Sequence, residues 1–363
     1  MEPPKPTLAT DHSLTGPRPG TFDEVIDRLG QRIADIGVPW SEDEFLQWAR
    51  VSTAFTHPGV SSIGSLLDLP VVTSDTFRFA DLTHLSRPAV RVFRTSGTST
   101  AFRGENRVRR LDIYDVSLSV GFRLLIAGRR KRRLSRLLSV VPRESQLPDS
   151  SLSYMLERFI ENEFEHSVCV VGKDGLDREA LLGALEEAAS AGEPTLLFAT
   201  TSSAAAVLDS LRDLKNAPKL PEDSLILTTG GAKRAQGRLD GAAVDQEIGE
   251  LLSGEVGSEY GMTELFSQAY RIGEGAFELP PWCAVLAIDP ATGRETQGLG
   301  LLRFVDLANL QSAVSVQTAD LGIAVDRQHF FYHSRAPGSV LRGCSVSFDE
   351  LTEPDPGPGT PDA

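Results

Sequence analysis

Residues 254–270 read GEVGSEYGMTELFSQAY, in which Thr263 and Glu264 follow a short β-like run. A threonine hydroxyl can bind a phosphate oxygen, and a glutamate carboxylate can bind Mg²⁺. The same two residues could also do no more than begin a helix, because a carboxylate is stabilised near a helix N-terminus. The choice between these interpretations depends on the residues that the fold brings beside this turn.

Three other stretches contain residues suited to a nucleotide. In RTSGTSTAFRG, residues 94–104, hydroxyl side chains surround Gly97, and hydroxyl and backbone N–H groups together can bind phosphate oxygens. In TTGGAK, residues 228–233, paired glycines let the backbone lie flat against a base. In VQTADLG, residues 316–322, an aspartate can accept hydrogen bonds from ribose hydroxyls. Each stretch on its own is equally consistent with a simple turn, and the sequence contains no G-x-x-x-x-G-K-S/T phosphate loop.

The elements that must position these turns follow from the hydrophobic periodicity. Helices are predicted at residues 23–36, 42–54, 112–127, 151–165, 176–190, 202–214 and 241–252. Strands are predicted at residues 137–141, 167–171, 195–199, 224–228 and 299–307. The alternation from 137 to 260 predicts an α/β fold with a parallel sheet covered by helices on both faces. The strand-rich segment 282–332 is expected to form an antiparallel subdomain.

Ligands of open α/β sheets bind beyond the carboxyl ends of the strands. The turns at 95–100, 228–233 and 257–264 are each expected at such an end, where their backbone N–H groups would face an anion. We therefore expect these three turns to lie close together around one ligand.

Composition narrows the function classes. The net charge of −14 argues against a nucleic-acid-binding surface. The basic run at 129–136, RRKRRLSR, is most simply a solvated face, although it could also dock an acidic carrier protein. Apolar runs are short, so no membrane span is expected, and the N-terminus has no secretion-signal pattern. With three scattered cysteines, a cytoplasmic location is expected.

The order TSGTST, TTGG, EYGMTE, QTAD and SRAPGSVLRGC resembles the ordered motifs of adenylate-forming enzymes, which include acyl-CoA synthetases, firefly-type luciferases and peptide-synthetase adenylation domains. Over about residues 90–350, EYGMTELFSQ, DLAN and RGCS are similar to the acyl-protein synthetase (LuxE-type) family. The resemblance implies the large N-terminal domain of such an enzyme, with the usual C-terminal domain absent or vestigial. The expected organisation is a disordered segment at 1–20, a catalytic domain at 21–332, a short C-terminal remnant at 333–352 and a disordered tail at 353–363.

The resemblance also implies a reaction that uses ATP and Mg²⁺. A fatty or aryl carboxylic acid would attack the α-phosphorus of ATP, pyrophosphate would leave, and the acyl-adenylate would pass its acyl group to a thiol. The acyl group would pass first to a thiol of the protein itself and then to a reductase partner. Alternatively, the acceptor would be coenzyme A or a carrier protein. A non-catalytic nucleotide-binding paralogue is a further alternative. The acid is expected to bind between the segments 200–230 and 258–268.

The resemblance assigns residues of this chain to the nucleotide. The phosphate-binding residues would be Thr95, Ser96, Gly97, Thr98, Ser99, Thr100 and Arg103, with Arg103 replacing a lysine that is usual in the family. The residues around the base, ribose and α-phosphate would be Gly230, Gly231, Tyr260, Gly261, Met262, Thr263 and Asp320, with Tyr260 stacked on adenine.

Three residues are expected to take part in the chemistry beyond nucleotide binding. Glu264 would bind Mg²⁺, and Arg335, in a hinge-like region, would reach the ribose or a phosphate. Cys344 in RGCS would be the acyl-accepting nucleophile, with Arg342 favouring its thiolate; the alternative is that Cys344 is a small buried residue in a turn. Cys283 is a weaker candidate for the same role.

Overall fold

The computed structural model describes residues 20–60, 62–95, 103–172, 175–230 and 240–336. Several predicted site residues lie outside these ranges, namely Ser96, Gly97, Thr98, Ser99, Thr100, Gly231 and Cys344. The predicted tail at 353–363 and nearly all of the predicted N-terminal segment lie outside them as well.

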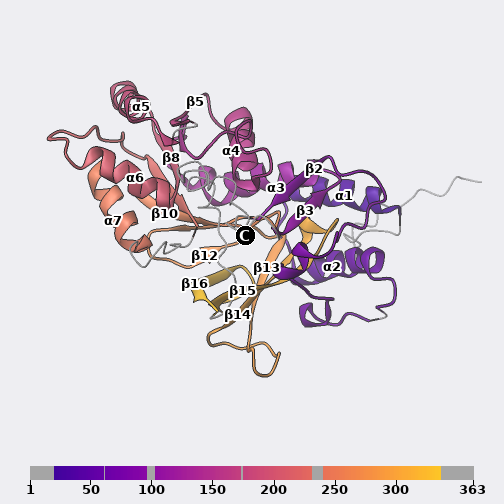
Figure 1. Cartoon of the computed structure of the whole chain (residues 1–363). Helices are drawn as coiled ribbons and strands as arrows, with labels where there is room; N and C mark the ends of the chain where they lie inside the picture. The colour runs from indigo at the N-terminus through magenta and orange to yellow at the C-terminus, as the bar shows by residue number, and fades with distance from the viewer. Residues whose placement is uncertain (1–19, 61, 96–102, 173–174, 231–239, 337–363) are drawn as a thin grey trace, which may run out of the picture.

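A parallel sheet occupies the middle of the chain (Figure 1). Its strands run in the order β5-β4-β8-β9-β10, with bounds β4 Arg136–Val140, β5 His166–Cys169, β8 Thr195–Thr200, β9 Leu225–Thr229 and β10 Glu255–Tyr260. The helices between them are α4 Ser151–Asn162, α5 Arg178–Ala191, α6 Thr201–Leu211 and α7 Gly241–Leu252. The predicted alternation of strands and helices is therefore confirmed.

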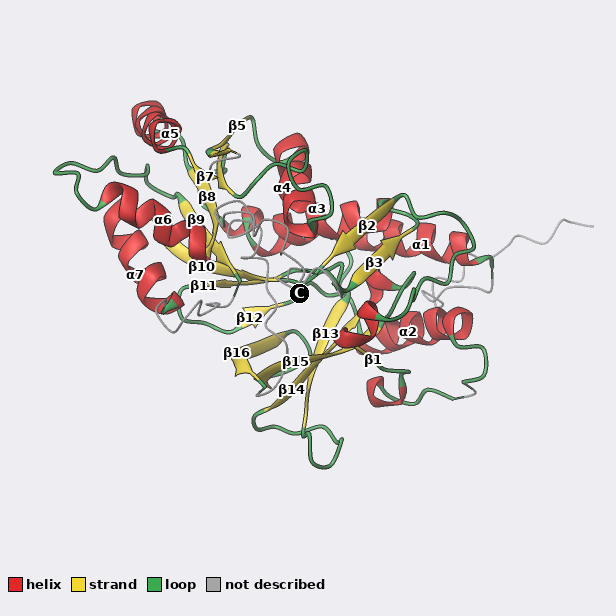
Figure 2. Ribbon diagram, viewed as in Figure 1, coloured by secondary structure: helices red, strands yellow, loops and turns green. Residues whose placement is uncertain are grey.

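Helices cover both faces of this sheet because the side chains of its strands alternate between the faces, and those of the central strands β8 and β9 are all buried and either apolar or threonine. On β8, Leu196 and Phe198 belong to the core that includes α4 and α3 (Asp112–Leu125). Leu197 and Ala199 belong to the opposite core, with residues of α5, α6 and α7. Figure 2 shows α6 and α7 on one side of β8–β10 and α3 and α4 on the other.

The antiparallel strands were expected as a subdomain, but they continue the same sheet, which has twelve strands in the described part of the chain. The reason is that β11 turns back beside β10 and carries the sheet on through β12 and β16 to β15, β14 and β13. Their bounds are β11 Ala269–Ile272, β12 Phe277–Glu278, β13 Cys283–Ile288, β14 Gly300–Asp306, β15 Ser315–Ala324 and β16 His329–Arg335. The predicted boundary after residue 332 thus falls within β16.

The N-terminal part packs against the face that α3 covers. Its elements are α1 Phe22–Ala34, α2 Glu42–Thr56, β1 Val72–Thr73, β2 Arg91–Arg94 and β3 Glu105–Val108. Helix α1 begins at a capping box formed by Thr21 and Glu24, and its four buried apolar side chains join the core of α2 and α3. Strands β2 and β3 form a hairpin, and β1 pairs with β15.

The remaining short elements connect these units. They are β6 Val171–Gly172, β7 Gly175–Leu176 and 3₁₀ turns at Leu66–Asp68, Ser74–Arg78, Ala127–Arg129 and Leu307–Asn309. Within the described ranges no helix is long and apolar enough to cross a membrane.

Candidate functional site

The loop at 96–102 starts and ends at residues that are hydrogen-bonded to each other. Thr95 N donates to Gly104 O at 2.9 Å, and Gly104 N donates to Thr95 Oγ1 at 2.8 Å. Arg103 Nε donates to Thr95 O at 2.7 Å, and its Nη1 lies 3.6 Å from the carboxylate of Asp149. Thr95 is buried, and its hydroxyl accepts the hydrogen bond from Gly104 N. We call Thr95, Arg103 and Gly104 the base of the predicted phosphate loop. The structure therefore places Arg103 at the base of the predicted phosphate loop.

The turn after β10 lies directly against this base. Thr263 Oγ1 donates to Arg94 O at 3.4 Å and lies 3.5 Å from Ser151 Oγ, at the first residue of α4. Asn106 Nδ2 in β3 donates to Thr263 O at 2.9 Å. Thr263 thus contacts Arg94, the residue before the predicted 95–100 turn, and residues 96–100 of that turn lie outside the described ranges. Sequence reasoning missed Ser151 and Asn106, because only the pairing of distant segments reveals them.

The segment DLAN, residues 306–309, holds the residues that follow Thr263. The buried Asp306 carboxylate accepts hydrogen bonds from Phe266 N at 2.7 Å, Ser267 N at 2.9 Å and Ser267 Oγ at 2.7 Å. Asn309 Nδ2 donates to Glu264 O at 2.8 Å. Burial raises the pKa of Asp306 to about 6, although these donors favour its charged form. In the sequence DLAN served only as a mark of family resemblance, whereas in the structure it positions the 264–267 turn.

Tyr260, Asp320 and Arg335 form a second group at the same turn. Tyr260 Oη donates to Asp320 Oδ2 at 2.7 Å, and Arg335 Nε lies 3.5 Å from Asp320 Oδ1 across the β15–β16 pair. Burial, with a smaller contribution from the Asp320 carboxylate, raises the pKa of Tyr260 well above its usual value, so the phenol keeps its proton and remains a donor. The Tyr260 ring is half-buried against Phe304 and Phe330, with centroid separations of 5.4 and 5.2 Å.

The 228–233 turn is described only as far as Gly230. Gly230 has a φ of 84°, a conformation that favours glycine, and its carbonyl accepts a hydrogen bond from Thr201 Oγ1 at 2.7 Å. Thr201 begins α6, so the two turns that end β8 and β9 are joined here. Met262 packs partly buried against the core around Phe304.

Glu259 is a buried carboxylic acid that sequence reasoning overlooked. It accepts a hydrogen bond from Thr229 Oγ1, and burial raises its pKa to about 7. Gly261 leaves room for it, because a Cβ on Gly261 would lie 2.4 Å from Glu259 Oε1. The available signal was a glutamate at the end of an apolar strand, one residue before Tyr260.

Glu264 is buried, with 2% of its surface exposed, and belongs to the turn that Thr263 begins. In the described part of the chain no three His, Cys, Asp or Glu side chains are grouped as a metal cage would require. Mg²⁺ is usually held by one or two carboxylates together with substrate phosphates, so a single carboxylate beside the turn predicted to bind phosphate is compatible with this ion.

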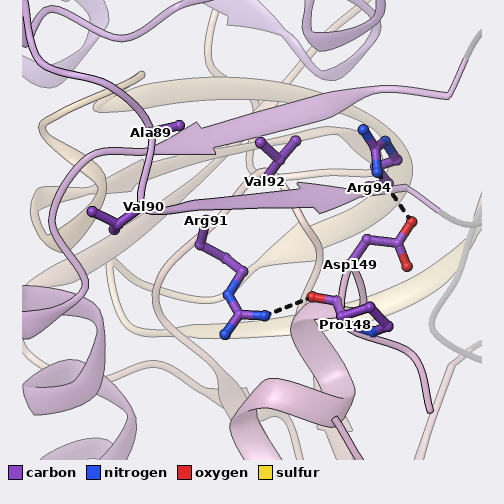
Figure 3. A pocket seen from close by; sticks show the side chains of 7 residues that line it. All are labelled: Ala89, Val90, Arg91, Val92, Arg94, Pro148 and Asp149. Carbon is purple, nitrogen blue, oxygen red and sulfur yellow. Dashed lines mark hydrogen bonds and ion pairs between the residues drawn. The ribbon is translucent and has the colours of Figure 1, made fainter. Parts of the chain in front are cut away.

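A pocket of about 300 Å³ lies between β2, the strand that precedes Thr95, and the loop before α4. In Figure 3, Arg91 and Arg94 of β2 reach the loop before α4; Arg91 donates to Pro148 O at 2.9 Å and Arg94 lies 3.5 Å from the Asp149 carboxylate. The remaining lining residues are Ala89, Val90 and Val92. Both arginines are thus engaged with the protein itself.

The described thiols are poor nucleophiles. Cys283 is fully buried, and burial raises its pKa well above the usual value, with a further contribution from Asp306. Burial also raises the pKa of Cys169.

The basic run at 129–136 is neutralised by acidic side chains from other elements. The ion pairs are Arg129–Glu278 at 2.6 Å, Arg130–Glu255 at 2.6 Å, Arg133–Glu165 at 2.7 Å, and Arg136 with Glu187 at 3.0 Å and Glu193 at 2.6 Å. Four of the five arginines of the run are thus paired with acidic side chains, whereas Arg132 donates to Gly192 O.

No family model matches the sequence, and a search of curated proteins finds no match. Among solved structures, the chain is similar to a long-chain-fatty-acid–CoA ligase from Archaeoglobus fulgidus, with 13% identity, a TM-score of 0.47 and coverage of 68% of this chain and 51% of that one. It is also similar to the o-succinylbenzoate coenzyme A synthetase of Bacillus subtilis in complex with ATP and a magnesium ion, with 16% identity, a TM-score of 0.46 and coverage of 67% and 49%.

A third similar structure is the coronafacic acid ligase of Pectobacterium brasiliense, with 15% identity, a TM-score of 0.43 and coverage of 62% and 43%. The chain spans about half the length of these structures or less. With TM-scores below 0.5, these similarities assign neither a family nor an activity to the chain, and the LuxE-type assignment stays a hypothesis.

Proposed function

We propose that this protein binds ATP at the carboxyl edge of its parallel sheet and converts a carboxylic acid into an acyl-adenylate. The observation that carries this proposal is that one turn, residues 260–264, touches two separate groups of polar side chains. Thr263 lies against the base of the Ser/Thr-rich loop, and Tyr260 lies against Asp320. These groups are far apart in sequence, and a triphosphate with its ribose is a ligand that extends over both.

The proposed roles follow from the chemistry of each group. The oxygen of the acid attacks the α-phosphorus of ATP, and the bond from that phosphorus to pyrophosphate breaks. In this proposal the hydroxyl of Thr263, which donates to Arg94 O in the structure, turns to donate to an α-phosphate oxygen, and the carboxylate of Asp320 accepts from ribose hydroxyls. Arg335 adds positive charge beside Asp320. Glu264 would hold Mg²⁺, which supplies charge neutralisation at the phosphates when bound.

In the second step we propose that a thiolate attacks the acyl carbon and AMP leaves, giving a thioester. Cys344 remains the proposed protein acceptor, and coenzyme A is the alternative. The buried Cys283 is not proposed, because its environment disfavours the thiolate.

The first step is tested by carboxylate-dependent exchange of labelled pyrophosphate into ATP. Glu264→Gln is expected to lower the exchange rate by more than about tenfold with the fold intact, because it removes the charge but keeps the size of the side chain. Glu250→Gln makes the same change on the exposed side of α7 and should leave the rate unaltered. Unaltered exchange in Glu264→Gln would refute the role of Glu264, and absence of exchange and of AMP release with every acid would favour the non-catalytic alternative.

The thiol step is tested by intact mass after incubation with ATP and an acid. We expect a hydroxylamine-labile acyl adduct on the wild type that is lost in Cys344→Ser and kept in Cys169→Ser. An adduct that persists in Cys344→Ser would eliminate Cys344. Thioester formation only after addition of coenzyme A would instead identify the chain as a coenzyme A ligase.

A further inference from the structure

Three polar side chains lie in one row across neighbouring strands, directly before the proposed reaction site. Thr229 of β9 is in register with Glu259 of β10, which is in register with Tyr270 of β11. Residues in register share a face of the sheet, and Tyr270 belongs to the apolar core beneath α3 and α4. Thr229, Glu259 and Tyr270 therefore place polar groups on the face that also carries the buried Leu225 and Leu227.

The hydrogen-bonding capacity of this row is not filled by the described part of the protein. Glu259, 5% exposed, accepts one hydrogen bond there, from Thr229. The hydroxyl of Tyr270, 3% exposed, has no hydrogen-bond partner among the described residues. Leaving buried polar groups without partners costs about 1–3 kcal/mol each, so such groups are uncommon unless a ligand uses them.

Asp306 shows what a purely structural buried carboxylate looks like in the same protein. It accepts hydrogen bonds from the backbone N–H groups of Phe266, Ser267 and Ala308 and from the hydroxyl of Ser267. Glu259, in contrast, has one donor and is directed at Gly261, where a Cβ would come within 2.4 Å of Oε1. The carboxyl group of Glu259 thus faces the turn that leads to Thr263.

We propose that Thr229, Glu259 and Tyr270 select the acid substrate by binding a hydrogen-bond donor, a hydroxyl or an amine, on its acyl part. This inference rests on the proposed function and names the substrate class: hydroxy- or amino-substituted acids rather than unsubstituted fatty or aryl acids. A hydroxyl or amine on the substrate would donate a second hydrogen bond to the carboxyl group of Glu259. The hydroxyl of Tyr270 can donate to the same substituent. An acid without a polar substituent leaves these groups unpaired, which a site of this kind discriminates against strongly.

The experiment compares pyrophosphate release with hydroxy- and aminobenzoates, benzoate, hydroxy-fatty acids and the matching fatty acids. For the wild type we expect kcat/KM to be at least about tenfold higher for an acid with a donor than for its unsubstituted counterpart. In Glu259→Gln and Tyr270→Phe this ratio should fall by about tenfold, mainly through KM of the substituted acid. Asp245→Asn changes a half-buried carboxyl group of α7 that is hydrogen-bonded to Thr228, the residue before Thr229, and should leave the ratio unchanged.

The inference would be overturned if the wild type had similar kcat/KM for substituted and unsubstituted acids, or if the ratio of the two values were unchanged in both variants. Either result would leave the proposed function in place. If Glu259→Gln fails to fold, Tyr270→Phe decides, because its hydroxyl has no described hydrogen-bond partner to lose. If no acid releases pyrophosphate, the proposed function fails. Calorimetry with the hydroxy- and aminobenzoates and the hydroxy-fatty acids then tests the three side chains separately: no binding, or equal affinity of wild type and Tyr270→Phe, overturns the inference.

Discussion

At the scale of single residues, Glu259 and Asp306, two of the buried carboxyl groups near the turn at 260–267, differ in their donors among the described residues. Asp306 accepts three hydrogen bonds from backbone N–H groups and one from a hydroxyl, whereas Glu259 accepts one from Thr229. Burial raises the pKa of both, to about 6 for Asp306 and about 7 for Glu259. In both groups burial is the largest cause, and the hydrogen bonds to each carboxylate act in the opposite direction.

The shifted pKa of Glu259 predicts a pH-dependent stability difference. The folded-state pKa of about 7 lies above the ordinary value of 4.5, so folding takes up a proton between these values. Stability from this group is complete below about pH 4.5 and is lost as the pH rises through 7. Relative to wild type, Glu259→Gln should therefore gain about 2–3 kcal/mol in the free energy of unfolding between pH 5 and pH 8.

Urea unfolding of wild type and Glu259→Gln at the two pH values measures this change. Other titrating groups cancel in the comparison, since both proteins contain them. A stability difference that is the same at pH 5 and pH 8 would contradict the raised pKa.

At the scale of elements, the site depends on a short 3₁₀ turn, Leu307–Asn309, that holds the loop after β10. Asp306 caps this turn and binds the loop at Phe266 and Ser267, while Asn309 binds Glu264 O. The carboxylate thus joins β14 to the segment that contains the two residues assigned to the α-phosphate and Mg²⁺. A loop fixed in this way keeps its polar groups in place without a ligand.

Asp306→Asn is predicted to destabilise the protein by about 2–4 kcal/mol, because the amide removes a buried charge that several donors require. Asp289→Asn is the matched control, since Asp289 accepts from Ala291 N and Thr292 Oγ1 in an exposed turn; it should cost much less than Asp306→Asn, because water screens this carboxylate. Chemical denaturation of both variants measures the difference. Equal losses would show that the connection from Asp306 to the loop contributes little.

At the scale of the whole molecule, one sheet joins the parallel and antiparallel halves. Arginines near the edges of this sheet form ion pairs with acidic side chains of other elements. Arg130, after α3, is 11% exposed and binds Glu255 of β10 and the carbonyl of Asp223 before β9. Arg133 and Glu165 are an exposed pair, with 66% and 57% of their side chains exposed. The contribution of each ion pair should follow its burial, because water screens exposed charges.

Arg130→Gln is therefore predicted to lower the free energy of unfolding by about 1–2 kcal/mol, and Arg133→Gln by less than about 0.5 kcal/mol. The loss in Arg133→Gln should disappear in 0.5 M salt, whereas most of the loss in Arg130→Gln should persist. Thermal melts at two salt concentrations measure both effects. A larger loss in Arg133→Gln than in Arg130→Gln would contradict this ordering.

The sequence by itself determined the local elements and the places where chemistry is possible. The periodicity predicted α7 at 241–252 with its observed bounds, and the strand–helix alternation predicted the parallel sheet. Both predictions depend on neighbours within a few residues, which the sequence contains. Thr263 and Asp320 were predicted as site residues from their side-chain chemistry; the structure places Asp320 within β15 rather than after it, and the roles of both residues stay predictions.

The tertiary structure alone decided which groups meet. The row formed by Thr229, Glu259 and Tyr270 exists because β9, β10 and β11 pair in a particular register, and a shift of one residue would turn these side chains to the other face. The role of Asp306 and the neutralisation of Arg130 likewise depend on partners far away in the chain. Strand order, register and burial arise from packing of the whole chain, so no short stretch of sequence specifies them.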